Sequence, residues 1–272
     1  MAKQTTSERR FSTALSTETT NFVRVLSCGY TKTGKTHFAL TFPDPVIVNA
    51  DAGLSTDIEA NCKVDPCVFT FSRVTELTKE NEFTSWLDFR QIVLELKYKK
   101  GVLWDEIKSY GYEPKTLIID SGSTLCDIFA HEIVADDSHK DKGGEHGETL
   151  FLQDYNLIMM RFFSLMDLVK TLPYHVVMTA ELADKQDDRQ HRYQAPAMTG
   201  QALGLRLPHY FDEIYLHYNE ADSSSGIKFF LSPLPTRDFE HAGSRKGIEL
   251  TTHEDPSFSM FEKSYTRKPR KA

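Results

Sequence analysis

Residues 29–36 read Gly-Tyr-Thr-Lys-Thr-Gly-Lys-Thr, and this G-x-x-x-x-G-K-T pattern constrains the fold more than any other part of the chain. An apolar run, 22–26, precedes it and a helical pattern, 37–40, follows it. In that setting of strand, loop and helix, the pattern forms a phosphate-binding loop. Gly29 and Gly34 allow the backbone to wrap a phosphate chain, and the helix N-terminus adds a positive field.

The side chains of the loop complete the prediction of a nucleoside-triphosphate site. Lys35 has the length to reach the β- and γ-phosphates, and the Thr36 hydroxyl is a ligand for Mg²⁺. We therefore expect ATP and Mg²⁺ as cofactors. The residues expected to bind the nucleotide are Gly29, Tyr30, Thr31, Lys32, Thr33, Gly34, Lys35, Thr36 and His37.

Length and composition are those of a globular protein with no membrane segment. The chain has 272 residues, 40% of them hydrophobic and 26% charged, which suits one large α/β domain or two small ones. No apolar stretch approaches the ~20 residues of a membrane span, and residues 1–7 lack the apolar core of a signal peptide. The four cysteines fit no zinc-binding spacing, and a reducing cytoplasm is the expected location.

Charge is distributed unevenly. Residues 263–272 carry five basic side chains and no acid, so removing them from the net charge of −7 leaves about −12 on residues 1–262. An acidic body argues against a generally basic nucleic-acid binder. The basic tail is either a solvated end or a flexible electrostatic arm for nucleic acid.

Apolar strands alternate with amphipathic helices along the chain. Strands are predicted at 45–51, 67–71, 116–121 and 174–179, with helices at 86–96, 125–133 and 151–172. This order predicts an α/β fold, a mainly parallel central sheet with helices on both faces. Short strands at 211–217 and 227–231 are expected to add antiparallel members, and polar loops are expected at 136–149 and 183–199. Residues 1–20 are predicted to be a flexible arm, 21–250 the core, and 251–272 a C-terminal segment with the basic tail.

Acidic residues at strand ends are candidates for chemistry, because ligands of such sheets bind beyond the carboxyl ends of the strands. Asp120, in Leu-Ile-Ile-Asp-Ser, is placed to hold Mg²⁺ beside Thr36, although a helix N-cap is an alternative role. Asp51 is placed to orient the attacking water, or else to cap a turn. Thr179 and Glu181 end a later strand, where a polar group would sense the γ-phosphate or, for Glu181, simply begin a loop.

The order of these motifs resembles the RecA-like P-loop ATPase core. The motifs are, in chain order, the phosphate-binding loop, Val-Asn-Ala-Asp-Ala-Gly-Leu, Leu-Ile-Ile-Asp-Ser and His-Val-Val-Met-Thr-Ala-Glu-Leu, followed by Met-Thr-Gly-Gln-Ala-Leu and Phe-Asp-Glu-Ile. The resemblance covers residues 22–250. Within that class the chain is similar to short phage nucleotide-binding proteins and Sak-type single-strand annealing proteins.

The resemblance implies roles for individual residues. Asp51 falls where the family has its catalytic acid, often Glu, and the shorter side chain calls fast hydrolysis into question. Glu181 falls where RecA has a glutamine that links the γ-phosphate to a DNA-binding loop. Residues 136–149 and 183–199 match the two DNA-binding loops, but their acids offset their bases, which predicts weak or assembly-dependent binding. Tyr193 and His191 are either base-stacking groups or ordinary loop aromatics.

Related ring or filament ATPases complete the site with a cation from a neighbouring subunit. Arg237, Arg245 and Lys246 lie in a polar C-terminal stretch, and Arg245 is the candidate for this catalytic role. The alternative is a solvated turn.

The function expected from these observations is an ATP-hydrolysing protein that acts on single-stranded DNA in phage-type recombination or annealing. Its expected partners are single-stranded DNA, further copies of the chain in a ring or filament, and a single-stranded DNA-binding protein; no membrane is involved. A replication motor or helicase-like subunit and a slow nucleotide-gated interaction protein remain alternatives. A small-molecule kinase is disfavoured, because residues 183–199 have as many acids as bases where an Arg-rich lid would lie.

Overall fold

The computed structural model describes residues 22–51, 54, 65–73, 82–135, 150–186, 190–222, 226–245, 248 and 250–261. Within these ranges the strands form a sheet in the order β10-β8-β7-β1-β5-β4-β2-β3, with β6 paired to β5 and β9 to β7. The strands are β1 (Arg24–Gly29), β2 (Pro45–Asn49), β3 (Cys67–Thr70), β4 (Thr116–Asp120), β5 (His175–Gln186), β6 (Arg192–Pro196), β7 (Glu213–Asp222), β8 (Gly226–Ser232), β9 (Gly243–Ser244) and β10 (His253–Glu254). The helices are α1 (Lys35–Leu40), α3 (Trp86–Tyr98), α4 (Val102–Ser109), α5 (Gly122–Ala135), α7 (Leu152–Val169), α8 (Gln201–Arg206) and the 3₁₀ helix η1 (Leu207–Tyr210).

The centre of the sheet is parallel. Strands β3, β2, β4, β5, β1 and β7 all run in one direction, whereas β8, β9 and β10 pair antiparallel. Parallel strands buried on both faces read as continuous apolar runs, which is how these segments appear in the sequence. The predicted fold class is therefore confirmed. The strand expected at 227–231, β8, is antiparallel as predicted, but the strand expected at 211–217, β7, pairs parallel with β1, so that expectation is wrong.

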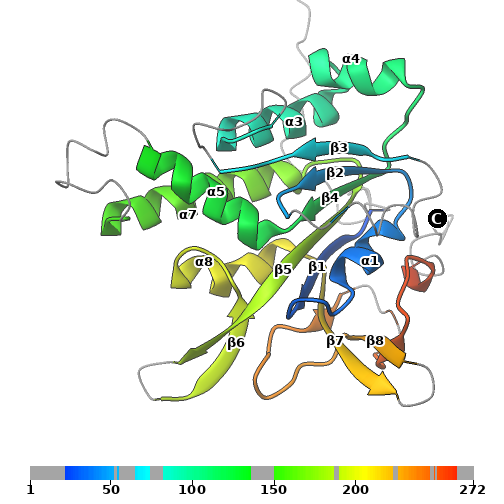
Figure 1. Ribbon diagram of the computed structural model, residues 1–272, viewed down its shortest axis with the longest axis vertical. Coiled ribbons are helices and arrows are strands. Elements are labelled where there is room, and N and C mark those ends of the chain that lie inside the picture. Colours follow the sequence, from blue (N-terminus) through cyan, green and yellow to red (C-terminus); the bar gives the residue numbers. More distant parts are fainter. Residues whose placement is uncertain are drawn as a thin grey trace, which may run out of the picture.

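Successive side chains along each strand point to opposite faces of the sheet, so the core has two layers. Val25, Ile47 and Val177 face α1 and pack with Phe38 of that helix. Their neighbours along the same strands face the other way, toward α3, α5 and α7. Figure 1 shows α1 on one side of the sheet and these longer helices on the other.

The ends and the buried face of helix α3 follow from its local sequence. Ser85 and Asp88 form a reciprocal capping box at its start, and Lys99, with φ 52°, ends it. Its apolar stripe is buried, as the spacing predicted. None of the helices in the described ranges is long and apolar enough to cross a membrane.

One predicted loop is wrong. Residues 183–186 continue β5 and pair antiparallel with β6, from Leu182 opposite Pro196 to Gln186 opposite Arg192. The second candidate DNA-binding loop is therefore a β-hairpin whose tip, 187–189, lies outside the described residues. Its strands carry polar side chains on both faces, so the sequence there lacks the alternation of apolar and polar residues that identifies a strand. Figure 1 shows the hairpin projecting from the body of the protein. The other loop, 136–149, the arm 1–20 and the basic tail 263–272 are also outside the described residues.

Candidate functional site

The phosphate-binding loop connects β1 to α1 in the way the sequence predicts. Gly34 has φ 85°, a left-handed conformation, and is the N-cap of α1. A Cβ at Gly34 would lie 2.9 Å from the Phe229 ring, and one at Gly29 would lie 2.6 Å from the His217 carbonyl oxygen. Both glycines are thus required by close packing against β7 and β8, and Gly34 also by its backbone conformation.

Lys35 points its ammonium group back into the loop. Its Nζ donates hydrogen bonds to the carbonyl oxygens of Gly29 (2.9 Å) and Tyr30 (2.7 Å), and the residue is 9% exposed. Burial lowers the pKa of Lys35, and the carboxylates of Glu181 and Asp120 act in the opposite direction. A desolvated cation held by two neutral carbonyls in a loop of this kind is suited to bind phosphate oxygens.

Asp120 joins the loop to the neighbouring strands. Its Oδ2 accepts a hydrogen bond from the Thr36 hydroxyl at 3.0 Å, and its Oδ1 accepts one from the Thr179 hydroxyl. The N-cap alternative does not hold for the carboxylate, because the Ser121 hydroxyl accepts from the Thr124 N–H at the start of α5. Burial raises the pKa of Asp120, and the two threonine hydroxyls counteract this.

The pair of Thr36 and Asp120 fits the magnesium ion that this kind of loop implies. Hard oxygen donors are the ligands that Mg²⁺ prefers, usually one or two carboxylates together with phosphate oxygens. A carboxylate and a hydroxyl lie side by side here, next to Lys35. They are the residues that would hold the ion.

Asp51 also lies in this group. Its Oδ1 accepts a hydrogen bond from the Thr124 hydroxyl at 2.5 Å, and its N–H donates to the Asp120 carbonyl at 3.3 Å. Its charge acts on both Lys35 and Asp120. The structure thus brings Asp51 beside the predicted metal and phosphate residues.

Glu181 and the hairpin contact the phosphate-binding loop directly. The Thr31 hydroxyl donates to Glu181 Oε1 at 3.0 Å. The Tyr30 hydroxyl donates to Asp184 at 2.9 Å and accepts from Gln194 Nε2 at 2.8 Å. Both strands of the hairpin are therefore hydrogen-bonded to residues expected to bind nucleotide. The Tyr30 contacts have no sequence signal, because their partners are more than 150 residues away.

Strands β7 and β8 cover the other side of the loop, which sequence reasoning did not foresee. Asn219 donates to the Lys32 carbonyl at 2.9 Å, and Phe229 stacks on His37 with ring centroids 6.4 Å apart. His217 is 1% exposed, and neither ring nitrogen has a hydrogen-bond partner among the described residues. Burial lowers the pKa of His217 to about 3, so the ring is neutral at physiological pH.

The candidate cations from the C-terminal stretch do not enter this site within one chain. Arg245 is 66% exposed and lies 3.7 Å from Asp212, whose N–H donates to the Arg24 carbonyl at the start of β1. The phosphate-binding loop follows the other end of β1. Arg237 is exposed, and the carbonyl of its neighbour Asp238 accepts from Gln194 of the hairpin. Lys246 lies outside the described residues.

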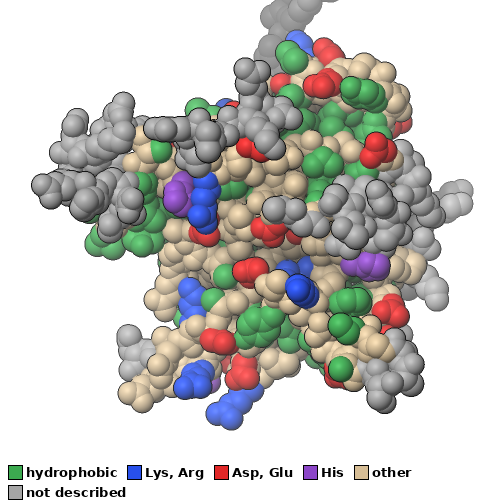
Figure 2. All heavy atoms as spheres, in the orientation of Figure 1, with side chains coloured by type: hydrophobic (Ala, Val, Ile, Leu, Met, Phe, Trp, Pro, Cys, Tyr) green, Lys and Arg blue, Asp and Glu red, His purple; other side chains and the backbone are tan. Residues whose placement is uncertain are grey.

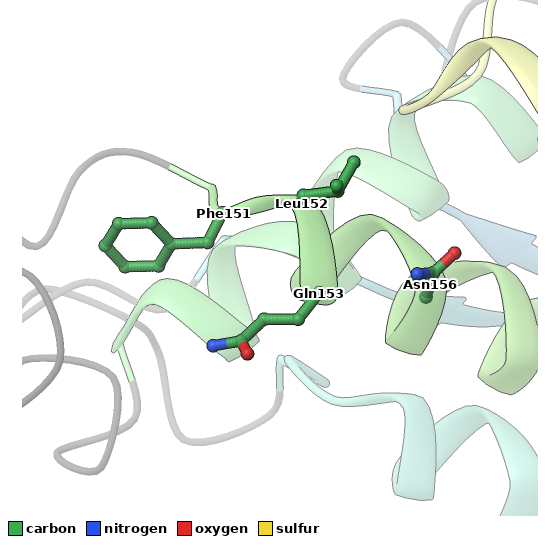
Figure 3. A pocket seen from close by; sticks show the side chains of 4 residues that line it. All are labelled: Phe151, Leu152, Gln153 and Asn156. Carbon is green, nitrogen blue, oxygen red and sulfur yellow. The ribbon is translucent and has the colours of Figure 1, made fainter.

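Charged side chains of both signs lie on the surface around the site. Figure 2 shows acidic and basic side chains intermixed over the carboxyl ends of the strands, with no broad basic patch among the described residues on this face. A separate cavity of about 480 Å³ lies at the amino end of α7, lined by Phe151, Leu152, Gln153 and Asn156 (Figure 3). Its described lining carries no charged side chain.

Comparison with known proteins identifies the family. Among solved structures, the KaiC-like protein PH0186 from the hyperthermophilic archaeon Pyrococcus horikoshii OT3 is similar over 85% of this chain and 84% of that chain, with 12% identity and a TM-score of 0.41. No curated protein sequence matches the chain. A family described as AAA domain matches residues 21–256, nearly all of the described fold. The chain therefore belongs to this AAA domain family and contains its nucleotide-binding domain.

Proposed function

We propose that this protein is a Mg²⁺-dependent ATPase that uses its nucleotide state to control how the β5–β6 hairpin engages single-stranded DNA in phage-type recombination or annealing. One observation carries this proposal. Thr31 and Tyr30 of the phosphate-binding loop are hydrogen-bonded to Glu181 and Asp184 of β5. A change at the phosphates is thereby coupled to the strand that leads into the hairpin. AAA-type families are typically ATPases, which agrees with the first part of the proposal.

Each residue of the site has a separate role in hydrolysis. Lys35 and the loop N–H groups bind and orient the phosphates, and Thr36 and Asp120 hold the metal ion. Bound Mg²⁺ supplies positive charge that offsets the charge of the phosphates. Asp51 orients the attacking water, and Thr124 fixes the direction of its carboxylate. A carboxylate positioned by a hydroxyl in this way can act as a general base.

Glu181 links the phosphate-binding loop to the β5–β6 hairpin. When the loop closes around phosphates, the Thr31 hydroxyl exchanges its hydrogen bond to Glu181 for a phosphate oxygen. The released carboxylate changes its contacts on β5, and the hairpin responds. The two states differ by a few hydrogen bonds, which is the scale of coupling free energies between sites, about 1–3 kcal/mol.

DNA binding by the hairpin depends on assembly. The described hairpin offers Lys185 and Arg192, which are opposed by Asp184. Affinity for nucleic acid rises with the number of phosphates neutralised, so one hairpin binds weakly and several in a ring or filament bind well. His191 and Tyr193 supply surfaces for base stacking. In the same assembly Arg245 of one subunit completes the ATP site of the next, and a single-stranded DNA-binding protein is a natural partner on the same strand.

A slower, nucleotide-gated interaction protein is the second candidate, and one observation favours it. Asp51 is shorter than the Glu usual at this place, and its Oδ1 is already engaged by Thr124 at 2.5 Å. A carboxylate so held is a weaker base, which slows hydrolysis without affecting binding. A replication motor shares the same core and differs in its partner.

Phosphate release with and without single-stranded DNA tests the proposal. We expect DNA to stimulate release in the natural protein, and Tyr30→Phe to reduce the stimulation while sparing ATP binding. The matched control is Tyr174→Phe, which removes a hydroxyl bonded to the Leu96 carbonyl far from the site. Equal release with and without DNA would leave the gated interaction protein as the better account. Strand-separation activity would favour a motor over an annealing protein.

A further inference from the structure

The edge of the sheet carries an apolar groove away from the nucleotide site. Strand β3 ends the sheet on this side, and α4 lies above it. Between them is a cavity of about 630 Å³. Its apolar lining includes Val68, Phe83, Leu103, Ile107 and Tyr110. Figure 2 shows hydrophobic side chains gathered in this region with acidic ones around them.

Two features of the groove point to an extended, basic segment as its occupant. Val68, in the middle of β3, is 37% exposed, whereas the end of β3 is paired with Phe83, whose N–H donates to the Thr70 carbonyl at 2.9 Å. Edge strands of this kind are normally covered or blunted. Asp65 and Glu106 line the groove, are exposed, and form no ion pair within the described ranges. Glu106 lies close enough to Cys67 to raise the pKa of that thiol, which burial and this charge bring to about 11.

The N-terminal residues of the chain match these requirements. Residues 1–21 contain two large apolar side chains after Met1, Phe11 and Leu15, and Phe11 directly follows Arg9 and Arg10. An aromatic ring next to two guanidinium groups is complementary to an apolar groove flanked by two carboxylates.

The segment also has the reach. Phe22 precedes β1, and Asp65 and Pro66 precede β3. Because these strands are parallel, both points lie at the amino ends of the strands, along the same side of the sheet. Four strand spacings separate β1 from β3, which is about 19 Å. The residues from 11 to 22 can span up to about 36 Å. A segment tethered this closely has an effective concentration in the millimolar range, which favours its own groove over that of another copy.

We propose that the N-terminal segment of each chain docks in its own edge groove, with Phe11 between β3 and α4 and with Arg9 and Arg10 beside Asp65 and Glu106. The docked segment covers Val68, in the part of the β3 edge that Phe83 does not pair with. It thereby protects the sheet from edge-to-edge association. This inference does not depend on the proposed ATPase activity.

Cross-linking to the natural thiol of Cys67 tests the proposal in the full-length chain. Cys67 lines the groove, whereas Cys28 and Cys126 are buried. In a Cys62→Ser background, Ser12→Cys should be joined to Cys67 by a short bis-maleimide, and the product should run as a monomer at every protein concentration. Thr5→Cys, farther along the segment, is the matched control and should react much more slowly.

Two substitutions then test the contacts themselves. Burying a phenylalanine ring changes a docking equilibrium by about tenfold or more, so adding Phe11→Ala should reduce the cross-linking rate by about that factor. Arg10→Glu should also reduce it, and Glu106→Arg in the same chain should restore it. A dimer-sized product would show that a second copy fills the groove and would overturn the proposal. An unchanged rate in Phe11→Ala, or cross-linking no faster than that of Thr5→Cys, would overturn it as well.

Discussion

The threonine at position 179 should matter for both stability and metal affinity, because its hydroxyl is buried and donates to the Asp120 carboxylate. Thr179→Val keeps the shape of the side chain and removes only this hydrogen bond. A hydrogen bond to a charged group contributes about 1.5–3 kcal/mol. A loss of about 2 kcal/mol lowers the Tm of a chain of this size by roughly 4–8 °C. The lost hydroxyl also leaves the pKa of Asp120 higher still, since that hydrogen bond favours the carboxylate.

The same substitution should weaken Mg²⁺-dependent nucleotide binding by about 10- to 100-fold, the usual effect of removing a group that orients a metal ligand. Thermal unfolding and a magnesium titration at fixed ATP measure the two effects. Thr116→Val is the matched control, because it removes a buried hydroxyl that donates to the neutral Pro43 carbonyl at 2.7 Å. It should cost stability and leave magnesium affinity unchanged. If both variants bind magnesium as the natural protein does, Thr179 does not orient Asp120 and the reasoning fails.

Three further predictions concern the charged residues. Asp51→Asn should leave ATP affinity within about twofold and reduce turnover by about 10²-fold or more; single-turnover phosphate release measures this, and equal loss of affinity would contradict the division of roles. Burial raises the pKa of Asp120 above its ordinary 3.8, so magnesium-dependent ATP binding should fall as the pH drops and should begin to do so above the range of an exposed Asp. A pH profile that follows an ordinary carboxyl would count against this. Lys35→Ala and Arg245→Ala subunits should each be nearly inactive alone and regain activity when mixed, since an arginine finger contributes about 10³–10⁵ in rate; full activity of Arg245→Ala alone would exclude the shared site.

Much of the fold could be predicted because its signals are local. The phosphate-binding loop, the buried runs of β2 and β4 and the apolar stripe of α3 each combine a known period with a recognisable end. Acids at strand ends gave Asp51, Asp120 and Glu181, since parallel strands bring their carboxyl ends together. The structure places all three around Lys35.

The remaining parts of the site depend on contacts between distant segments. Thr124 has no distinctive spacing, and its role depends on its contact with Asp51. Thr179 is predicted as a site residue from its place at a strand end, but its hydrogen bond to Asp120 is not. The β5–β6 hairpin was predicted to be a loop because its strands are polar on both faces, and its stability comes from pairing and from Tyr30. The packing of β7 and β8 over the phosphate-binding loop is likewise set by tertiary contacts, which strand propensity does not report.

Binding of ATP to purified Lys35→Ala protein, measured by isothermal titration calorimetry with Mg²⁺ present, tests the central claim most directly. Lys35 is the buried cation of the phosphate-binding loop, and charge-assisted hydrogen bonds to phosphate contribute about 1.5–3 kcal/mol. The account therefore predicts that affinity falls by about 10- to 100-fold or more, while Lys115→Ala, which removes an exposed ion pair with Asp44, binds as the natural protein does. Unchanged affinity in a folded Lys35→Ala protein would contradict the assignment of this loop as the nucleotide site.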